Sequence, residues 1–172
     1  MYTNARNDMN AKPTLKALMS SFAREGKVEW IGVREEKYQP LLVREHVTAV
    51  TGGGLEGDRY SGSSGKRGVT LIQAEHLAVI ASTLGIDSVD PQQLRRNIVV
   101  SGINLLALKD KRFRLGDALL EYTGLCHPCS RMEQAFGPGG YNAVRGHGGI
   151  NARVLEGGVI RLADALRVVQ DD

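Results

Sequence analysis

The sequence predicts a mainly β fold, a curled barrel of short strands with a few helices packed outside it. Short apolar runs recur along the chain, long helical patterns are few, and strands and helices do not alternate as an α/β fold would require. A six-residue motif also occurs twice, at 114–119 and 161–166, with one difference between the copies. Its central Asp is typical of a turn, which predicts two similar hairpin-like corners of one sheet.

The N-terminal region is expected to add a helix to this barrel. Residues 1–12 are polar and contain no signal-peptide core, so they are predicted to be a disordered leader before a single domain at 13–172. Leu15, Leu18, Met19 and Phe22 recur at helical spacing between Thr14, a predicted N-cap, and Gly26, a predicted C-cap. This amphipathic helix is expected to cover part of the core; partner or membrane-surface binding is the less favoured alternative.

The middle of the chain contains the predicted strands. Residues 28–33 and a segment running from 41 to 50 form an expected opening pair, and 69–72 is a short buried strand. A helix is predicted over 73–84, ended by Gly85. Asp90 and Pro91 then predict an N-cap and a first helical residue, and 97–100 predicts another strand.

Composition limits the function classes. The 172 residues are 42% hydrophobic and 24% charged with a net charge of +3, which fits one globular domain with its own core and permits an anionic ligand. Aromatic residues make up 5% and are scattered, which disfavours a protein that stacks nucleic-acid bases. No apolar run is long enough to span a bilayer. We therefore expect a cytoplasmic protein that binds no nucleic acid and has no membrane-spanning segment.

The two cysteines of the chain, Cys126 and Cys129, are separated only by His127 and Pro128. Pro128 suits the first turn of a helix, so Cys129 is expected in that turn, where the positive helix end and Arg131 favour a thiolate. Other interpretations stay open at this point: two core-filling residues, a thioredoxin-type dithiol, or part of a zinc site. A domain of this size does not need a disulfide bond for stability.

Two glycine-rich loops, at 52–60 and 137–149, accompany these cysteines. Glycine lets a backbone approach a ligand closely, although tight turns between strands explain such residues equally well. Neither loop has a phosphate-loop or dinucleotide fingerprint. Basic residues lie at the edges of predicted elements, where ligand-binding groups are often mounted; they are Lys66, Arg67, Arg95, Arg96, Arg145 and His147. Arg96 and Asn97 together suit a polar heterocycle or phosphate.

In their order and spacing, several stretches of the chain resemble the MOSC domain, the module found at the C-terminus of molybdenum cofactor sulfurases and as stand-alone bacterial proteins. These stretches are 54–59, 67–72, 95–102, 113–117, 126–129 and 146–149, followed by Arg153-Val154 and Gly157-Gly158. Together they extend from about residue 27 to the end. One departure is Ala163-Asp164, where the family usually has Gly-Asp; this turn either avoids positive φ or accepts strain.

The resemblance implies a β-barrel that binds molybdenum cofactor (molybdopterin), with Cys129 as metal ligand or sulfur carrier and Cys126 as a helper. Residues expected around the cofactor are Asp58, Arg67, Arg96, Asn97, Arg145, His147 and Gly148. Relatives reduce N-hydroxylated compounds with electrons from flavin or iron-sulfur partners. A pyridoxal-phosphate label is attached to the family through the desulfurase domain of the sulfurases, but no pyridoxal phosphate is expected in this chain.

The resemblance leaves three functions open. The chain is a molybdenum-dependent oxidoreductase, a carrier that receives persulfide sulfur from a cysteine desulfurase, or a module that holds cofactor without turnover. Each function places Cys129 at the site, because a thiolate is both a soft metal ligand and a nucleophile.

Overall fold

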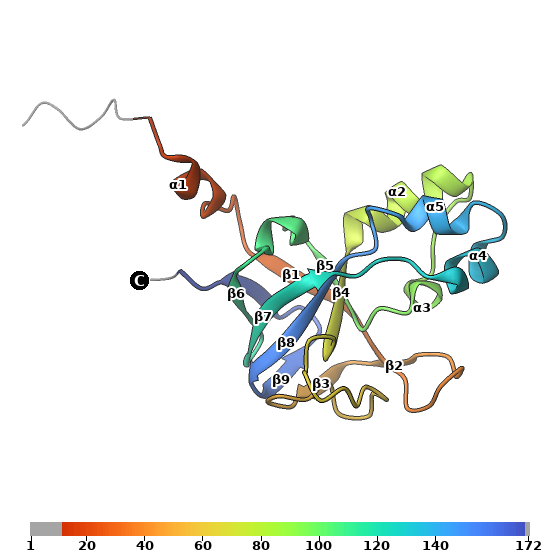
Figure 1. Ribbon diagram of the computed structural model, residues 1–172, viewed down its shortest axis with the longest axis horizontal. Coiled ribbons are helices and arrows are strands. Elements are labelled where there is room, and N and C mark those ends of the chain that lie inside the picture. The colour runs from red at the N-terminus through yellow and green to blue at the C-terminus, as the bar shows by residue number, and fades with distance from the viewer. Residues whose placement is uncertain (1–11, 171–172) are drawn as a thin grey trace, which may run out of the picture.

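The computed structural model describes residues 12–170, and its centre is a closed barrel of seven strands (Figure 1). The strands follow the order β10-β6-β7-β8-β4-β5-β1, and β1 pairs with β10 to close the ring. Their bounds are β1 Gly26–Val33, β4 Val69–Gln73, β5 Ile98–Ser101, β6 Arg112–Leu115, β7 Ala118–Leu125, β8 Ile150–Glu156 and β10 Ala165–Val168. Only β4 and β5 are parallel neighbours in this ring. The predicted mainly β barrel is confirmed.

Shorter elements surround the barrel. Strand β2, Leu42–Arg44, extends the sheet beyond β1, while β3, His46–Ala49, and β9, Gly158–Arg161, form a separate two-stranded sheet. The helices are α1 Leu15–Met19, α2 Ala74–Leu84, α3 Pro91–Leu94, α4 Ser130–Phe136 and α5 Gly140–Val144, with a 3₁₀ helix at Leu105–Leu108. Helices α2 to α5 gather at one end of the barrel, and α1 stands away from it (Figure 1).

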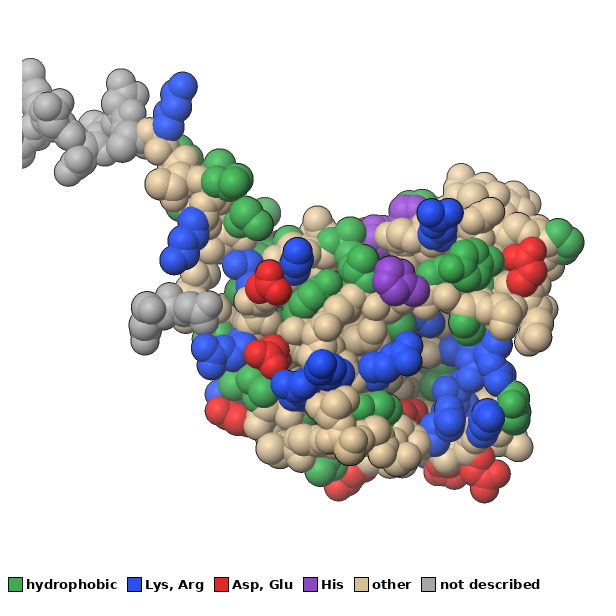
Figure 2. Space-filling model, viewed as in Figure 1, with side chains coloured by type: hydrophobic (Ala, Val, Ile, Leu, Met, Phe, Trp, Pro, Cys, Tyr) green, Lys and Arg blue, Asp and Glu red, His purple; other side chains and the backbone are tan. Residues whose placement is uncertain are grey.

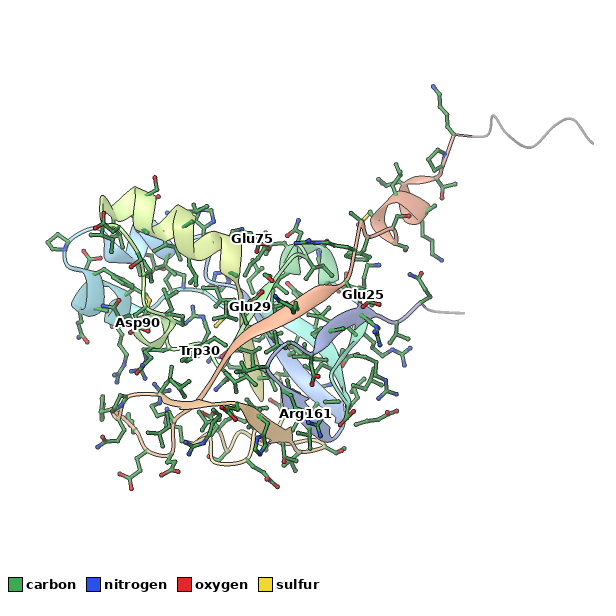
Figure 3. The ribbon with its side chains drawn as sticks, turned by 180° about the vertical axis from the view of Figure 1, so that it is seen from behind. Glu25, Glu29, Trp30, Glu75, Asp90 and Arg161 are labelled. Carbon is green, nitrogen blue, oxygen red and sulfur yellow. The ribbon has the colours of Figure 1, made fainter. Side chains whose placement is uncertain are left out.

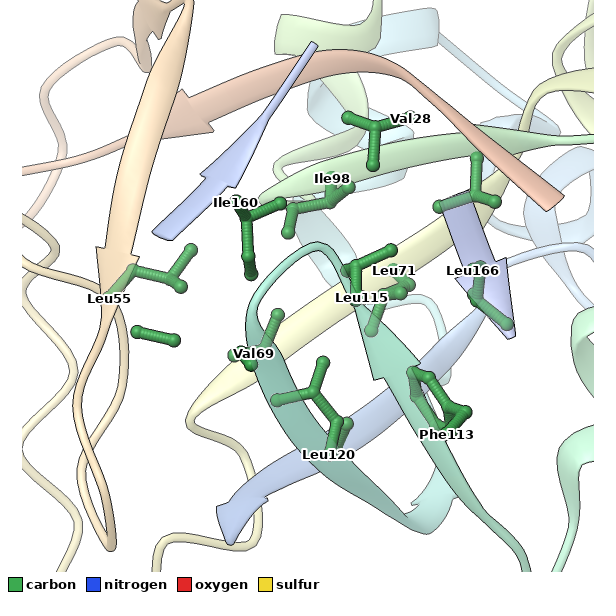
Figure 4. Close-up of a cluster of buried hydrophobic side chains, with 14 of the residues drawn as sticks. Val28, Leu55, Val69, Leu71, Ile98, Phe113, Leu115, Leu120, Ile160 and Leu166 are labelled. Carbon is green, nitrogen blue, oxygen red and sulfur yellow. The ribbon is translucent and has the colours of Figure 1, made fainter. Parts of the chain in front are cut away.

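The core has two parts, separated by the sheet. Leu71 and Ile98 point into the barrel with Phe113 and Leu115 (Figure 4). The residues that follow Leu71 and Ile98 in the sequence belong instead to a second cluster, which lies under the helices. That second cluster includes Ile72, Ile80, Leu94, Val99, Met132 and Val144, and Trp30 of β1 packs against it (Figure 3). Strands β4 and β5 are therefore buried on both faces, which explains the adjacent apolar residues Leu71-Ile72 in β4 and the apolar run 98–100 in β5.

Capping residues mark where helices α2 and α3 end or begin. Gly85 ends α2 in the left-handed conformation at φ 69°. Asp90 accepts a hydrogen bond from the backbone N–H of Gln92, and Gln93 completes a capping box around α3. Both predicted boundaries are confirmed.

The predicted N-terminal helix is only partly correct. Thr14 is its N-cap, but α1 ends at Met19, and Gly26 opens β1 instead of ending the helix. The hydroxyl of Ser21 donates to the carbonyl of Ala17, a local bond that competes with helix continuation. The expected cover of the core is wrong for α1, which has no buried residue, while Phe22 alone packs against the barrel. Most of the expected leader lies outside the described residues.

Two strand predictions also require correction. The segment 41–50 divides at Glu45, so that β2 pairs with β1 whereas β3 pairs with β9. The first copy of the repeated motif forms a hairpin between β6 and β7. The second copy does not, because β9 and β10 leave their turn into different sheets. The two turns contact each other, since the N–H of Gly116 donates to Ala165 O.

The turn at Ala163 accepts strain. Its φ of 67° lies in the left-handed region, which costs an L-residue about 1 kcal/mol. We expect Ala163→Gly to raise the free energy of unfolding by up to about 1 kcal/mol, less the entropy that glycine adds to the unfolded chain. Chemical denaturation measures the change. Gly116→Ala in the matching turn should destabilise, because a Cβ there would lie 2.3 Å from Asp164 Oδ2; equal effects of the two changes would contradict this explanation.

Candidate functional site

A cavity of about 440 Å³ opens at the end of the barrel where β1 and β7 finish and β5 and β8 begin. Its wall includes residues from the first glycine-rich loop and from the cysteine segment. The lining residues are Arg34, Leu41, Asp58, Arg59, Tyr60, Ser61, Gly62, Arg67, Thr70, Arg95, Arg96, Asn97, Cys126, His127, Cys129 and Asn151. Figure 2 shows Lys and Arg side chains gathered beside a hollow on the right-hand side of the molecule.

The two cysteines differ in exposure although both line the cavity as free thiols. Cys126 is 7% exposed, and its backbone N–H donates to Gly149 O at 2.9 Å. Burial raises the pKa of the Cys126 thiol, opposed by the nearby charges of Arg96 and Arg67. Cys129 is exposed. The accessible nucleophile or ligand of the pair is therefore Cys129.

Cys129 is the N-cap of α4, which corrects the expectation that it lies in the first turn. Its backbone is extended at φ −130° and ψ 175°, Ser130 is the first helical residue, and Pro128 precedes the cap. The extended backbone of Cys129 keeps it outside the helix, and Arg96 fixes the segment before it by donating to the carbonyls of Cys126 and His127.

Arg96 is a buried support for this segment. Its Nε donates to Gly148 O and its Nη1 to Leu94 O, both at 2.7 Å, and Nη2 donates to Cys126 O at 3.2 Å. A guanidinium has five N–H donors, and backbone carbonyls occupy most of them. The side chain joins three segments of the chain around the cavity, so its direct role is positioning the cysteine segment.

Asn97 and Asp58 form a second support. Asn97 Oδ1 accepts from the backbone N–H and the hydroxyl of Thr70, and Asn97 Nδ2 donates to Gly32 O and to Asp58 Oδ1. Asp58 Oδ1 also accepts from the backbone N–H of Arg34 at 2.8 Å. These bonds connect the first glycine-rich loop to β1, β4 and β5 and shape the cavity wall.

The structure brings together six of the nine residues predicted for the site. Asp58, Arg67, Arg96, Asn97, Cys126 and Cys129 line the cavity, and Arg145, His147 and Gly148 are not among the lining residues. The carbonyl of Gly148 binds Arg96, and a Cβ at this glycine would lie 2.3 Å from Cys126 O. His147 instead stacks edge-to-face on His76 of α2, with ring centroids 5.0 Å apart. Arg145 is exposed at the end of α5.

Sequence reasoning missed Arg34 and Arg59 as cavity residues, and it left Arg95 as one basic edge residue among several. Arg34 follows β1 directly, and Arg59 N donates to Arg34 O at 2.7 Å. Arg95 points into the cavity from a left-handed backbone at φ 62°, where α3 ends. Their location in the sequence could have suggested them, because each arginine stands immediately beside a predicted strand or turn.

The raised pKa of Cys126 predicts a pH dependence of stability. Because the buried thiol ionises less readily than in the unfolded chain, stability falls as pH rises past the unfolded value of about 8.5. We expect the free energy of unfolding to decline above that pH and Cys126→Ala to flatten the decline. Urea titrations of both proteins across the alkaline range measure the slope. An unchanged slope in the variant would contradict the assignment to this thiol.

The zinc interpretation finds no support in the described part of the chain, where no group of three or more His, Cys, Asp or Glu residues is placed to hold a metal ion. Residues 12–170 also contain no helix long and apolar enough to cross a membrane. The fold and the cavity define a class of protein: a closed barrel of parallel and antiparallel strands with one exposed thiol in a cavity lined by arginines.

The comparisons identify the family. A family model described as the MOSC domain matches residues 50–167, and the chain belongs to the MOSC domain family. A search of curated proteins found no match.

Solved structures share the fold. The YuaD protein from Bacillus subtilis superposes with a TM-score of 0.75 at 19% identity, covering 87% of this chain and 98% of that one. YiiM from Geobacillus stearothermophilus gives 0.64 at 18% identity, with coverage of 84% and 75%. YiiM from Escherichia coli gives 0.65 at 18% identity, with coverage of 85% and 71%.

Proposed function

We propose that this protein binds molybdenum cofactor in the cavity, with the Cys129 thiolate as a metal ligand. The observation that carries the proposal is the exposed thiol of Cys129 on the wall of an arginine-lined cavity of about 440 Å³. Thiolates are soft ligands suited to such a metal, and small-ligand sites have volumes of this order. The family membership supports the same class of ligand.

The cavity fits an anionic cofactor on the evidence of its own donors. The Nε of Arg34 is buried without a hydrogen-bond partner, and an unpaired buried donor is costly unless a ligand satisfies it. Arg67 adds an exposed cation at the rim. When bound, the cofactor supplies redox chemistry for the reduction of N-hydroxylated compounds.

The chain's own residues would orient the ligand. Arg96 and Asn97 hold the cysteine segment and the first glycine-rich loop, and the arginines attract the anionic parts of the cofactor. Electrons would come from a flavin or iron-sulfur partner, in a reducing compartment such as the cytoplasm where both thiols stay free. Asp58, through its bonds to Arg34 and Asn97, would hold the first glycine-rich loop in place at the cavity.

Molybdenum retention tests the proposal. The purified protein, reconstituted with cofactor, should retain molybdenum, and Cys129→Ser should lose most of it because the ligand sulfur is gone. Cys126→Ser serves as the matched control, since the same exchange at the buried cysteine should cost less. Elemental analysis gives the metal bound per chain. Equal retention by the wild type and Cys129→Ser would rule out direct ligation.

A second function is favoured by the unequal exposure of the two thiols. Cys129 can be reached by a cysteine desulfurase; its thiolate would attack the terminal sulfur of the donor's persulfide and release the donor thiolate. Cys126 lies on the same cavity wall as a resolving thiol. Intact-mass measurement after incubation with a desulfurase and cysteine should find one added sulfur atom, absent from Cys129→Ser. No added sulfur on the wild type would remove this candidate.

A further inference from the structure

Helix α1 exposes an apolar face that the rest of the described chain does not cover. Leu15, Leu18 and Met19 lie on one side of the helix, at spacings of three and four residues, and are 72%, 55% and 62% exposed. Figure 2 shows hydrophobic side chains at the surface along this segment. An isolated helix of five residues is marginal in water, so α1 gains stability when this face is buried.

The connection from α1 to the barrel holds the helix away from the core. Gln170 Nε2 donates to Ser20 O at 3.3 Å, directly after the helix, and Arg24 Nε donates to Gly102 O at 3.2 Å. Between these two attachments, Phe22 packs against the barrel core. Figures 1 and 3, which view the molecule from opposite sides, both show α1 projecting from the barrel. The cover for its apolar face therefore comes from another molecule.

The charge of the same segment limits what can cover it. Residues 9–24 contain no acidic residue and three basic ones, which are Lys12, Lys16 and Arg24. Both lysines are exposed, and in the described part of the chain no carboxylate forms an ion pair with either. The first acidic residue after α1, Glu25, is already paired with Arg167 at 2.6 Å. An apolar face flanked by unpaired cations is typical of a segment that binds an anionic lipid surface.

A second copy of the chain fits this face less well. In a symmetric dimer the same surface patch meets itself, so Lys12 and Lys16 would lie beside the matching cations of the other copy. Like charges brought together in this way oppose association. The headgroups of anionic lipids instead carry the opposite charge, and the acyl chains beneath them accept apolar side chains.

We propose that α1 is a peripheral anchor that binds the surface of a membrane containing anionic lipids. Leu15, Leu18 and Met19 enter the boundary between headgroups and acyl chains, and the two lysines contact lipid phosphates. Strand β1 starts at the end of the barrel nearest α1 and finishes at the cavity, and its eight residues span about 25 Å. The anchored protein thus keeps the cavity clear of the bilayer, and the anchor does not depend on what binds at Cys129.

Co-sedimentation with lipid vesicles tests the anchor. The full chain should bind vesicles of phosphatidylglycerol and phosphatidylcholine in equal parts more than about tenfold more tightly than vesicles of phosphatidylcholine alone, and added salt should weaken this binding. Leu18→Gln should weaken it about tenfold, because one leucine is lost from the buried face. Lys16→Gln should weaken it about fivefold, because one cation is lost from the lipid phosphates.

Matched substitutions separate the anchor from the general attraction of a protein with a net charge of +3. Val79→Gln removes an exposed apolar side chain of α2, and Arg145→Gln removes an exposed cation at the end of α5. Neither should change vesicle binding measurably. The free energy of unfolding of Leu18→Gln should equal that of the wild type, because α1 has no buried residue.

Two results would overturn the anchor on lipid measurements alone: no binding to the anionic vesicles at low salt, or equal binding by the wild type and all four variants. A wild-type dimer in light scattering that is lost in Leu18→Gln, without lipid binding, would also overturn it, because the apolar face would then belong to a second copy. Molybdenum retention by Leu18→Gln should match the wild type, so that failure of the anchor and failure of the proposed function are distinguishable.

Discussion

Arg96→Met is expected to lower the free energy of unfolding by about 3 kcal/mol. The change leaves the carbonyls of Leu94, Cys126 and Gly148 without their donor, and each unpaired buried group costs about 1–3 kcal/mol, although water entering from the cavity recovers part of this loss. Equilibrium denaturation measures the effect. Alkylation of Cys126 should also accelerate, because the segment that buries this thiol loses its main anchor.

Arg96→Lys separates charge from geometry. A lysine keeps the cation but cannot reach carbonyls on three segments with one planar fork, so we expect a loss close to that of Arg96→Met. If Arg96→Lys were as stable as the wild type, the positive charge alone would explain the role of this residue, and the carbonyl bonds would be unimportant.

Gly149→Ala should destabilise the protein still more, by upwards of about 4 kcal/mol. A Cβ at this position would lie 1.9 Å from Leu71 O and 2.9 Å from Ile72 Cα, in the backbone of β4. The residue also has φ 86°, and its carbonyl accepts from Cys126 N. The side chain would therefore push β4 away from the loop that anchors the cysteine segment. Thermal and chemical denaturation, or soluble yield if folding fails, measure the result.

Gly146→Ala is the matched control in the same loop. Its φ of 84° is similar, but a Cβ there would meet nothing within 4 Å, so only the backbone strain of about 1 kcal/mol is expected. The difference between the two variants isolates the steric contact with β4. Similar losses in both would show that positive φ alone makes Gly149 necessary.

Elements governed by neighbouring residues could be predicted from the sequence. Gly85 and the Asp90-Pro91 pair mark their helices because caps are satisfied within a few residues. The barrel followed from the number of short apolar strands. The partner of a strand is not local information: nothing within 41–50 indicates that its second half pairs with β9, more than a hundred residues later.

The same distinction applies to the candidate site. Cys129, Arg67 and Asp58 were found because they stand in recognisable motifs. The role of Arg96 depends on carbonyls at 94, 126 and 148, whose meeting requires the folded barrel. Arg34 has no motif of its own, and the buried Nε that lacks a hydrogen-bond partner becomes visible only in the tertiary structure.

The closure of the barrel by β1 and β10 has a consequence for biosynthesis. Of the seven barrel strands, β10 is synthesised last, and its Leu166 pairs with Gly26 of the first strand, β1. Until β10 has emerged from the ribosome, β1 and β6 lack the neighbour that β10 provides for both, and their unpaired edges are exposed. Contacts this distant in sequence form slowly. The barrel therefore closes only after the segment that carries β10 has left the ribosome.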